Sequence, residues 1–217
     1  YQLKAYKNWV ENNKKGIFAM ATGTGKTITA LNVLLNEYKK AGTYKSIIIV
    51  PTITLIDQWK EECISFNFKN IITVDTKTNW KEELAFLNTA SKLTDVSYII
   101  IITYASLWRK KFAEHLRNLP NDTLFIADEV HNIGSPKLLT FLPKLHFNRR
   151  LGLSATPERI YDNWENNKIN DFFEDSQPYV FSFSMEEAIK ENRLSRYKYF
   201  PKKVELTEKE FEKYKNI

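Results

Sequence analysis

The sequence contains a single cysteine, so the chain cannot form an internal disulfide bond. Its longest apolar stretch, YIIIITYASLW, is interrupted by polar residues and does not reach the length needed to cross a bilayer. The opening residues, YQLKAYKNWVENNKK, lack the apolar core of a signal peptide. No segment repeats at a fixed period, and none is of low complexity. These absences predict a soluble cytoplasmic protein with no membrane partner.

The charged residues give a formal net charge of +6 over 217 residues, and 43% of the residues are hydrophobic. This hydrophobic share is ample for a packed core, and the length suits one large domain or one domain with an appendage. The positive charge is compatible with a polyanionic partner but does not identify one. His115, His146 and Cys63 lack the spacing of metal ligands, so no zinc site is predicted.

Short runs rich in isoleucine, valine and leucine alternate with helical patterns. The runs occupy residues 16–20, 46–51, 70–74, 98–104, 123–128 and 149–156. They are continuous rather than alternating, as expected for parallel strands that are covered by helices on both faces. The first helix should bury Ile28, Leu31, Leu35 and Tyr38, and the second should bury Cys63 as an inert thiol. The order predicts a three-layer α/β domain with a mostly parallel central sheet.

The pattern changes after Pro157. Residues 158–176 read as a connection with a short helix, and residues 178–194 read as a strand followed by a helix that starts near Ser184. A capping-box pattern at Thr207 and Glu210 should start another helix, which the chain end cuts short, so we expect a fragment of a longer protein. We therefore divide the chain into a core (1–157), an extension with a linker (158–206) and the start of a further connection (207–217).

The stretch ATGTGKT follows the first predicted strand and opens the first predicted helix. Gly23 and Gly25 let the backbone curl so that several N–H groups point inward, where the positive end of the helix dipole adds to them. Lys26 can then reach the β- and γ-phosphates of a nucleotide, and the Thr27 hydroxyl can bind Mg²⁺. The usual loop pattern has a further glycine where this chain has Met20.

A second polar cluster, LFIADEVH, ends a predicted buried strand. Carboxylates at such a strand end are costly to bury without a cation, which makes a metal physically reasonable there. Asp128 would hold Mg²⁺ directly or through water, and Glu129 would orient or deprotonate the attacking water molecule. A solvated turn is the alternative interpretation of this cluster alone.

ATGTGKT, DEVH and LGLSATPER, in this order and spacing, resemble motifs I, II and III of the first RecA-like domain of superfamily-two helicases and translocases. The resemblance covers residues 1 to about 206 and implies a RecA-like P-loop NTPase fold. Residues 184–214 resemble the linker found in relatives of the DNA-repair helicase and of the restriction-enzyme motor subunit (type III restriction res subunit), which favours DNA over RNA without excluding RNA.

The resemblance also implies residue roles. Nucleotide binding falls to Gln2, which would read the adenine edge, and to the loop residues Thr22, Gly23, Thr24, Gly25, Lys26 and Thr27. Catalysis falls to Lys26, Asp128 and Glu129. Coupling of the nucleotide state to nucleic-acid contacts falls to His131, Ser154 and Thr156. Nucleic-acid contacts fall to Pro51, Thr52, Thr103 and Tyr104.

The function implied is the ATP-binding half of an ATP-dependent DNA helicase or translocase that uses ATP and Mg²⁺. Family members close the nucleotide between two such domains, and the second domain supplies arginines to the γ-phosphate. This chain has no second glycine loop and no Q-x-x-G-R-x-x-R segment, so we expect it to be nearly inactive alone. A P-loop small-molecule kinase and a non-catalytic nucleotide-binding scaffold are the alternatives. The basic and aromatic run RYKYFPKK (196–203) is a further candidate for nucleic-acid contact or, alternatively, a solvated strand.

Overall fold

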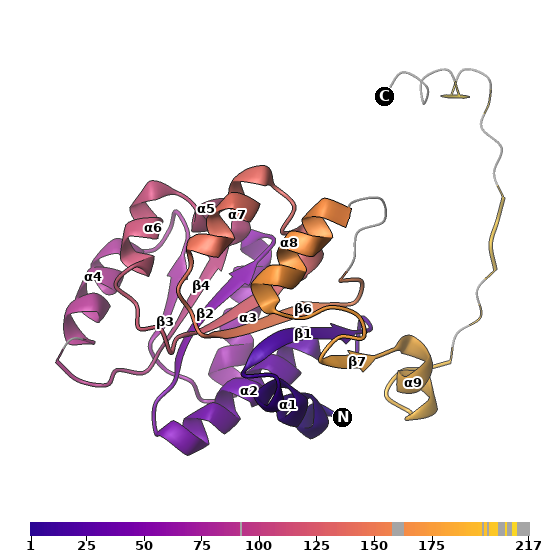
Figure 1. Ribbon diagram of the computed structural model, residues 1–217, viewed down its shortest axis with the longest axis horizontal. Helices are drawn as coiled ribbons and strands as arrows, with labels where there is room; N and C mark the ends of the chain where they lie inside the picture. The colour runs from indigo at the N-terminus through magenta and orange to yellow at the C-terminus, as the bar shows by residue number, and fades with distance from the viewer. Residues whose placement is uncertain are drawn as a thin grey trace.

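The computed structural model describes residues 1–91, 93–157, 163–196, 198, 200–203, 207 and 210–211 (Figure 1). Within this part of the chain, seven strands form one sheet in the order β3-β4-β2-β5-β6-β1-β7, and every neighbouring pair is parallel. The strands are β1 (Lys15–Met20), β2 (Lys45–Val50), β3 (Ile71–Val74), β4 (Tyr98–Thr103), β5 (Leu124–Asp128), β6 (Arg149–Ser154) and β7 (Phe181–Phe183). The predicted α/β class with a parallel sheet is confirmed.

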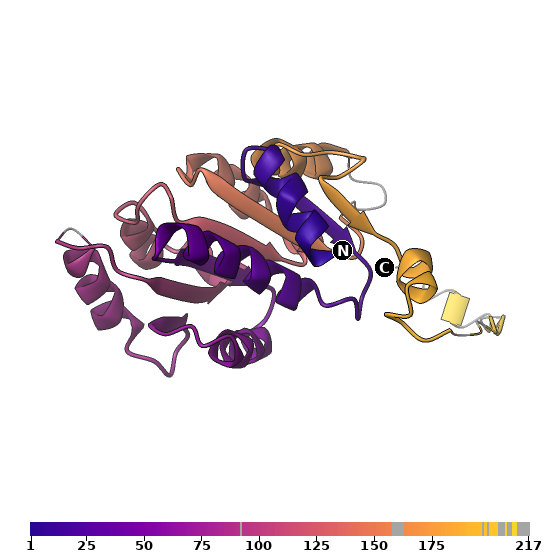
Figure 2. The ribbon, with the colours of Figure 1, turned by 90° about the horizontal axis from the view of Figure 1, so that it is seen from below.

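Helices cover both faces of this sheet (Figures 1 and 2). They are α1 (Gln2–Glu11), α2 (Lys26–Ala41), α3 (Ile53–Ser65), α4 (Trp80–Ala90), α5 (Tyr104–Leu107), α6 (Lys110–Leu116), α7 (Pro136–Phe141), α8 (Asn163–Phe173) and α9 (Met185–Lys190), with 3₁₀ turns η1 (Val130–Asn132) and η2 (Leu142–Lys144). Among the described helices, none combines the length and the apolar character needed to span a membrane.

The central strands are buried along their length because each supplies side chains to both helical layers. Ile47 and Ile49 of β2 pack with α4, α6, α7 and α8, whereas Ile48 and Val50 pack with α1, α2 and α3. This alternation follows from the two-residue period of a strand. Each such side chain stabilises the fold by about 1.5–3 kcal/mol relative to an exposed position. The continuous isoleucine runs in the sequence are thus explained by burial on both faces.

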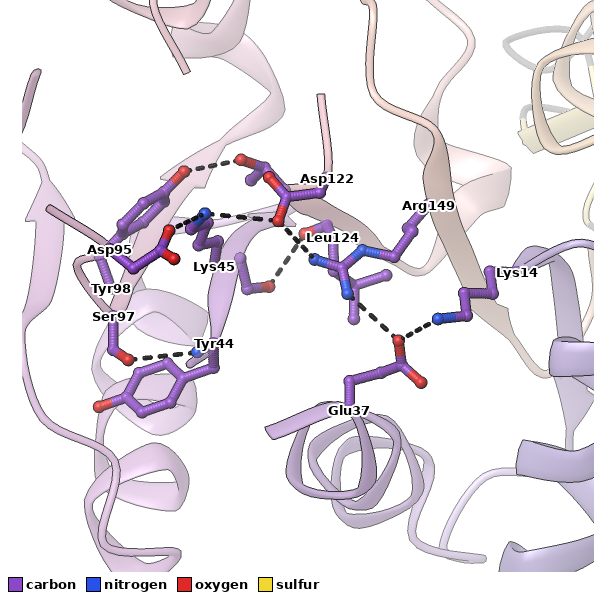
Figure 3. A network of polar contacts seen from close by, with 12 residues as sticks. Lys14, Glu37, Tyr44, Lys45, Asp95, Ser97, Tyr98, Asp122, Leu124 and Arg149 are labelled. Carbon is purple, nitrogen blue, oxygen red and sulfur yellow. Dashed lines mark hydrogen bonds and ion pairs between the residues drawn. The ribbon is translucent and has the colours of Figure 1, made fainter. Parts of the chain in front are cut away.

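The buried face of α2 differs from the predicted one. Tyr38 is 40% exposed, while Glu37, in the fourth turn of the helix, is only 4% exposed. Its carboxylate accepts hydrogen bonds from the hydroxyl of Tyr6 (2.8 Å), the amine of Lys14 (2.6 Å) and the guanidinium of Arg149 (3.2 Å). Figure 3 shows Lys14 and Arg149 converging on this carboxylate. Because the partners come from other elements, the helix pattern alone could not reveal that Glu37 faces inward.

The residues after Pro157 contribute to the same sheet. Strand β7 pairs in parallel with β1, with Phe18 opposite Phe181, and helix α8 lies in the predicted connection. Ser184 caps α9 through a complete capping box with Glu187, so the helix start predicted near Ser184 is confirmed. Residues 158–162 lie outside the description, as does most of the run 204–217. The proposed boundaries after 157 and 206 therefore stay predictions.

Candidate functional site

The carboxyl ends of β1, β5 and β6 meet at one edge of the sheet. Ala19 of β1 lies opposite Ser154 of β6, and Leu153 of β6 lies opposite Asp128 of β5. The glycine loop, the acidic pair and the predicted coupling residues all follow directly from these strand ends. Ligands of open parallel α/β sheets bind at this edge.

The glycine loop has the curled backbone that its sequence predicts. Gly23 and Gly25 have φ angles of +81° and +78°, in the left-handed region that favours glycine. Gly25 is the N-cap of α2, whose 16 residues start at Lys26, and in the described part of the chain no side chain caps this helix start. Thr24 is 2% exposed and its hydroxyl donates to the carbonyl of Ala21 (2.6 Å), which closes the turn. The loop therefore presents uncapped backbone donors at the positive end of a long helix.

The departure from the usual pattern at Met20 falls outside this turn. Met20 is the last residue of β1 and is fully buried among the side chains between the sheet and α1, α2 and α3. A side chain is accommodated there because the chain is still an extended strand and does not turn until Ala21. The missing glycine does not alter the turn itself.

Lys26 and the acidic pair face each other across this edge. The amine of Lys26 lies 3.4 Å from Oε1 of Glu129, and their side chains are 10% and 28% exposed. Glu129 has a φ of +50°, a conformation that costs a non-glycine residue free energy and is concentrated at functional sites. The predicted meeting of loop lysine and acidic pair is therefore present.

Asp128 is 7% exposed and is held by a hydrogen bond from the indole of Trp59 to Oδ2 (2.9 Å). Burial raises the pKa of Asp128, and the nearby charge of Glu129 raises it further, while the Trp59 bond and Lys26 lower it. A divalent cation would compensate this buried charge. No three His, Cys, Asp or Glu side chains converge as a metal cluster in the described ranges. Mg²⁺ fits this site, since it usually keeps waters and phosphates among its ligands and needs one or two carboxylates. The pairing of Thr27 with Asp128 on this ion stays a prediction.

The three predicted coupling residues are in contact. The ring Nδ1 of His131 lies 2.9 Å from the hydroxyl of Ser154, and this hydroxyl accepts from the backbone N–H of Thr156 (3.1 Å). The same Nδ1 lies 3.5 Å from Oε2 of Glu129. His131 thus bridges the acidic pair and the end of β6, as a coupling role requires, although the role itself is still a prediction.

Gln2 lies beside the loop, with its amide nitrogen 3.9 Å from where a Cβ of Gly25 would be. Its carbonyl oxygen accepts from the amide of Asn32 (3.1 Å). Sequence reasoning missed Tyr1, whose hydroxyl donates to the carbonyl of Thr24 (3.0 Å) and whose ring stacks on Phe183 with centroids 4.6 Å apart. The only sequence signal for Tyr1 is its place next to Gln2.

A groove of about 750 Å³ lies at the ends of β2, β3 and β4. Three of the four predicted nucleic-acid residues, Pro51, Thr52 and Thr103, line it. Its wall also includes Trp80 and the basic residues Lys81, Arg109, Lys110 and Lys111, which sequence reasoning did not single out. The signal that could have found the last three is the dense basic run in WRKK.

The assignment of Tyr104 to nucleic-acid contact is wrong for its side chain. The ring is 6% exposed, and the hydroxyl donates to the backbone carbonyl of Asp128 (2.8 Å). Tyr104 is the first residue of α5, so its side chain turns into the core while its neighbours Thr103 and Ala105 face the groove.

Residues 1–159 match the protein-family model described as type III restriction enzyme, res subunit. The chain belongs to this family. The predicted relation to the restriction-enzyme motor subunit among superfamily-two proteins is therefore confirmed, and the match covers the glycine loop, the acidic pair and Ser154 in one span.

Individual proteins agree with the family. The chain is 32% identical over 218 residues to the DNA 3'-5' translocase XPB2 of Sulfurisphaera tokodaii, a match that covers 100% of this chain and 42% of XPB2. A nuclease-deletion mutant of the Type ISP restriction-modification enzyme LlaGI, solved with a DNA substrate mimic, has a similar fold with a TM-score of 0.64. It is 20% identical, and the match covers 89% of this chain and 20% of LlaGI.

The Sulfolobus solfataricus SWI2/SNF2 ATPase core, solved with dsDNA, is similar in fold with a TM-score of 0.57 and 22% identity. The match covers 78% of this chain and 34% of that one. The chain therefore spans less than half the length of each of these three proteins.

Proposed function

We propose that this chain is the ATP-binding half of an ATP-dependent DNA translocase or helicase. The observation that carries the proposal is the contact between Lys26, at the start of α2, and Glu129, at the end of β5. The phosphate-binding loop follows β1 and the acidic pair ends β5, the two strands that flank β6. A loop and an acidic pair of this kind are the parts that nucleoside triphosphate hydrolysis requires.

The proposed nucleotide is ATP with Mg²⁺. The uncapped N–H groups of the loop and the amine of Lys26 bind the phosphates. Gln2, whose position beside Gly25 supports this role, reads the adenine edge. Mg²⁺, held by Asp128 and the Thr27 hydroxyl, would neutralise phosphate charge. Glu129 would accept a proton from the water whose oxygen bonds to the γ-phosphorus, while the bond to the β-phosphate oxygen breaks and ADP leaves. The amine of Lys26 would contact the phosphates instead of Glu129, which frees this carboxylate.

The proposed nucleic acid is DNA, which binds mainly through its phosphates in the groove beside Thr52 and Thr103. Four basic side chains, Lys81, Arg109, Lys110 and Lys111, line this groove and supply the charge. The names of the relatives, a DNA translocase and proteins solved with DNA or a DNA mimic, favour DNA over RNA.

The proposed partner is a second RecA-like domain. Since the chain spans 42% of the length of XPB2, we infer that the arginines which contact the γ-phosphate lie in further sequence of the full-length protein. The described part of the chain would therefore bind nucleotide weakly and hydrolyse it very slowly when isolated.

The test is made on the full-length protein with three variants. Lys26→Ala should abolish nucleotide binding, because it removes the only side-chain charge at the start of α2. Glu129→Gln should keep binding and stop DNA-stimulated phosphate release. Lys45→Ala is the matched control, because the Lys45 side chain is 11% exposed, close to the 10% of Lys26, but lies at the opposite strand end.

Normal hydrolysis by Glu129→Gln would refute the assignment of the base, and normal nucleotide binding by Lys26→Ala would refute the site. Transfer of phosphate to nucleosides or sugars instead of water would indicate a small-molecule kinase. A strand-displacement assay and a triplex-displacement assay then distinguish strand separation from movement along intact duplex.

A further inference from the structure

Two buried aromatic side chains donate hydrogen bonds to the same acidic residue. The indole N–H of Trp59 donates to Oδ2 of Asp128 (2.9 Å), and the hydroxyl of Tyr104 donates to the backbone carbonyl of Asp128 (2.8 Å). Trp59 and Tyr104 are 1% and 6% exposed. One bond therefore fixes the carboxylate and the other fixes the backbone that carries it.

The two donors belong to the helices that begin at the groove. Thr52 is the N-cap of α3, which carries Trp59 in its second turn, and Pro51, Thr52 and Ile53 line the groove. Thr103 is the N-cap of α5, which starts with Tyr104, and Thr103, Ala105 and Ser106 line the groove as well. Two separate segments of the groove wall thus end in a buried hydrogen bond to Asp128.

Both bonds are specific in chemistry rather than incidental to packing. An indole nitrogen can only donate, so Trp59 favours the ionised carboxylate over the neutral acid. The partner of the Tyr104 hydroxyl is a backbone carbonyl, which can only accept, so this hydroxyl is the donor. A phenylalanine in place of Tyr104 would keep the ring, and one in place of Trp59 would keep most of the aromatic surface, but neither could donate a hydrogen bond.

We propose that Trp59 and Tyr104 are positioning residues that couple the groove to the Asp128 carboxylate. A DNA strand that contacts Thr52 and Thr103 shifts the first turns of α3 and α5, and the two hydrogen bonds carry this shift to the residue that holds Mg²⁺. The inference rests on the proposed function and adds to it a physical route by which DNA regulates the nucleotide site. Such coupling is reciprocal, so bound nucleotide with Mg²⁺ must change the affinity for DNA by the same factor.

The test compares Trp59→Phe and Tyr104→Phe with Tyr98→Phe in the full-length protein. Tyr98 is a matched control for Tyr104, because it is fully buried and its hydroxyl lies 2.6 Å from the hydroxyl of Thr123, but it starts β4 at the opposite edge of the sheet. Each variant is titrated with a fluorescent non-hydrolysable ATP analogue and Mg²⁺, with and without a short duplex oligonucleotide. Thermal unfolding checks that each variant is folded.

In the unaltered protein and in Tyr98→Phe, the duplex should raise nucleotide affinity by roughly 5–150-fold, the usual range for coupled sites. In Trp59→Phe and Tyr104→Phe the factor should fall to roughly twofold or less. The Mg²⁺ concentration for half-maximal nucleotide binding should rise about tenfold in Trp59→Phe, because a partner that orients a metal ligand is lost.

A second measurement uses the unaltered protein, so it does not depend on whether a variant folds. In protein labelled with ¹⁵N-tryptophan, the duplex should shift the indole N–H signal of Trp59. The Trp9 signal should stay in place, because the Trp9 indole donates to the carbonyl of Arg150 at the far edge of the sheet. A Trp59 signal that does not respond to the duplex overturns the inference.

These experiments distinguish failure of the inference from failure of the proposed function. If the duplex strengthens nucleotide binding equally in Trp59→Phe, Tyr104→Phe and Tyr98→Phe, the inference is overturned while the proposed function stands. If the unaltered protein binds no nucleotide, or binds it independently of Lys26, the proposed function fails and the inference fails with it.

Discussion

Glu37 provides the sharpest test of how the fold is held together at the edge of the sheet opposite the site. Its carboxylate joins α2 to α1 through Tyr6, to the start of β1 through Lys14 and to the start of β6 through Arg149. From Arg149 the contacts continue through Asp122 and Lys45 to Asp95 (Figure 3). The substitution Glu37→Gln keeps the shape of the side chain and removes its charge.

The expected cost follows from burial. The side chain of Glu37 is 5% exposed and that of Arg149 is 16% exposed, so neither can exchange its partner fully for water. The Nε atom of Arg149 already has no partner among the described residues. Breaking a buried pair costs about 3–5 kcal/mol, and the 37% exposure of Lys14 reduces this because its amine can turn to solvent. We therefore expect Glu37→Gln to lower the free energy of unfolding by about 3 kcal/mol, or the midpoint of thermal unfolding by about 6–12 °C.

The matched control is Asp95→Asn, the same chemical change in an ion pair with Lys45 whose aspartate side chain is 75% exposed. It should cost less than about 1 kcal/mol. Urea unfolding at neutral pH, followed by circular dichroism, measures both variants. Equal losses of stability from the two substitutions would refute the reasoning, because burial would then make no difference.

The effect of Glu37 should depend on pH with a definite sign. Burial alone would raise its pKa, but the hydrogen bonds from Lys14, Tyr6 and Arg149 outweigh burial and lower the pKa below its ordinary value of 4.5. The folded state then binds the proton less readily than the unfolded state. The stability that Glu37 contributes is full above the ordinary pKa and is lost as the pH falls through the lowered one. The difference between the native protein and Glu37→Gln should therefore shrink in acid, and a difference that grows in acid would contradict the assignment.

Two further predictions concern single side chains. Burial raises the pKa of Cys63 to about 12, so its thiol should not react with iodoacetamide at pH 8 in the folded protein but should react fully in urea. Mass spectrometry measures both reactions, and labelling of the folded protein would contradict the burial of Cys63. Lys110→Ala should weaken DNA binding and lower the slope of log K against log salt by about one. Lys39→Ala, at the exposed end of α2, is the control and should leave the slope unchanged. Equal slopes for the two variants would show that Lys110 does not contact DNA phosphates.

The strands and the glycine loop could be predicted from sequence because the forces that define them are local or are averaged over many residues. A central parallel strand needs apolar side chains at every position, so β2 and β4 appear directly as isoleucine runs. Gly23 and Gly25 supply left-handed conformations that few other residues adopt, so the turn follows from two residues and their spacing. Neither prediction required knowing which element lies beside which.

Predictions failed where a polar group is satisfied by a distant segment. The position of Tyr104 beside the groove residues gave no indication that its hydroxyl reaches Asp128, 24 residues later. Trp59 lies on the same buried face of α3 as Cys63, but apolar periodicity treats tryptophan as a hydrophobic side chain and ignores its one N–H donor. Glu37 is the converse case, because a charged side chain normally lies on the surface, whereas hydrogen bonds from three distant residues keep this one buried. Buried polar groups require partners, and the identity of a partner is set by the packing of whole elements.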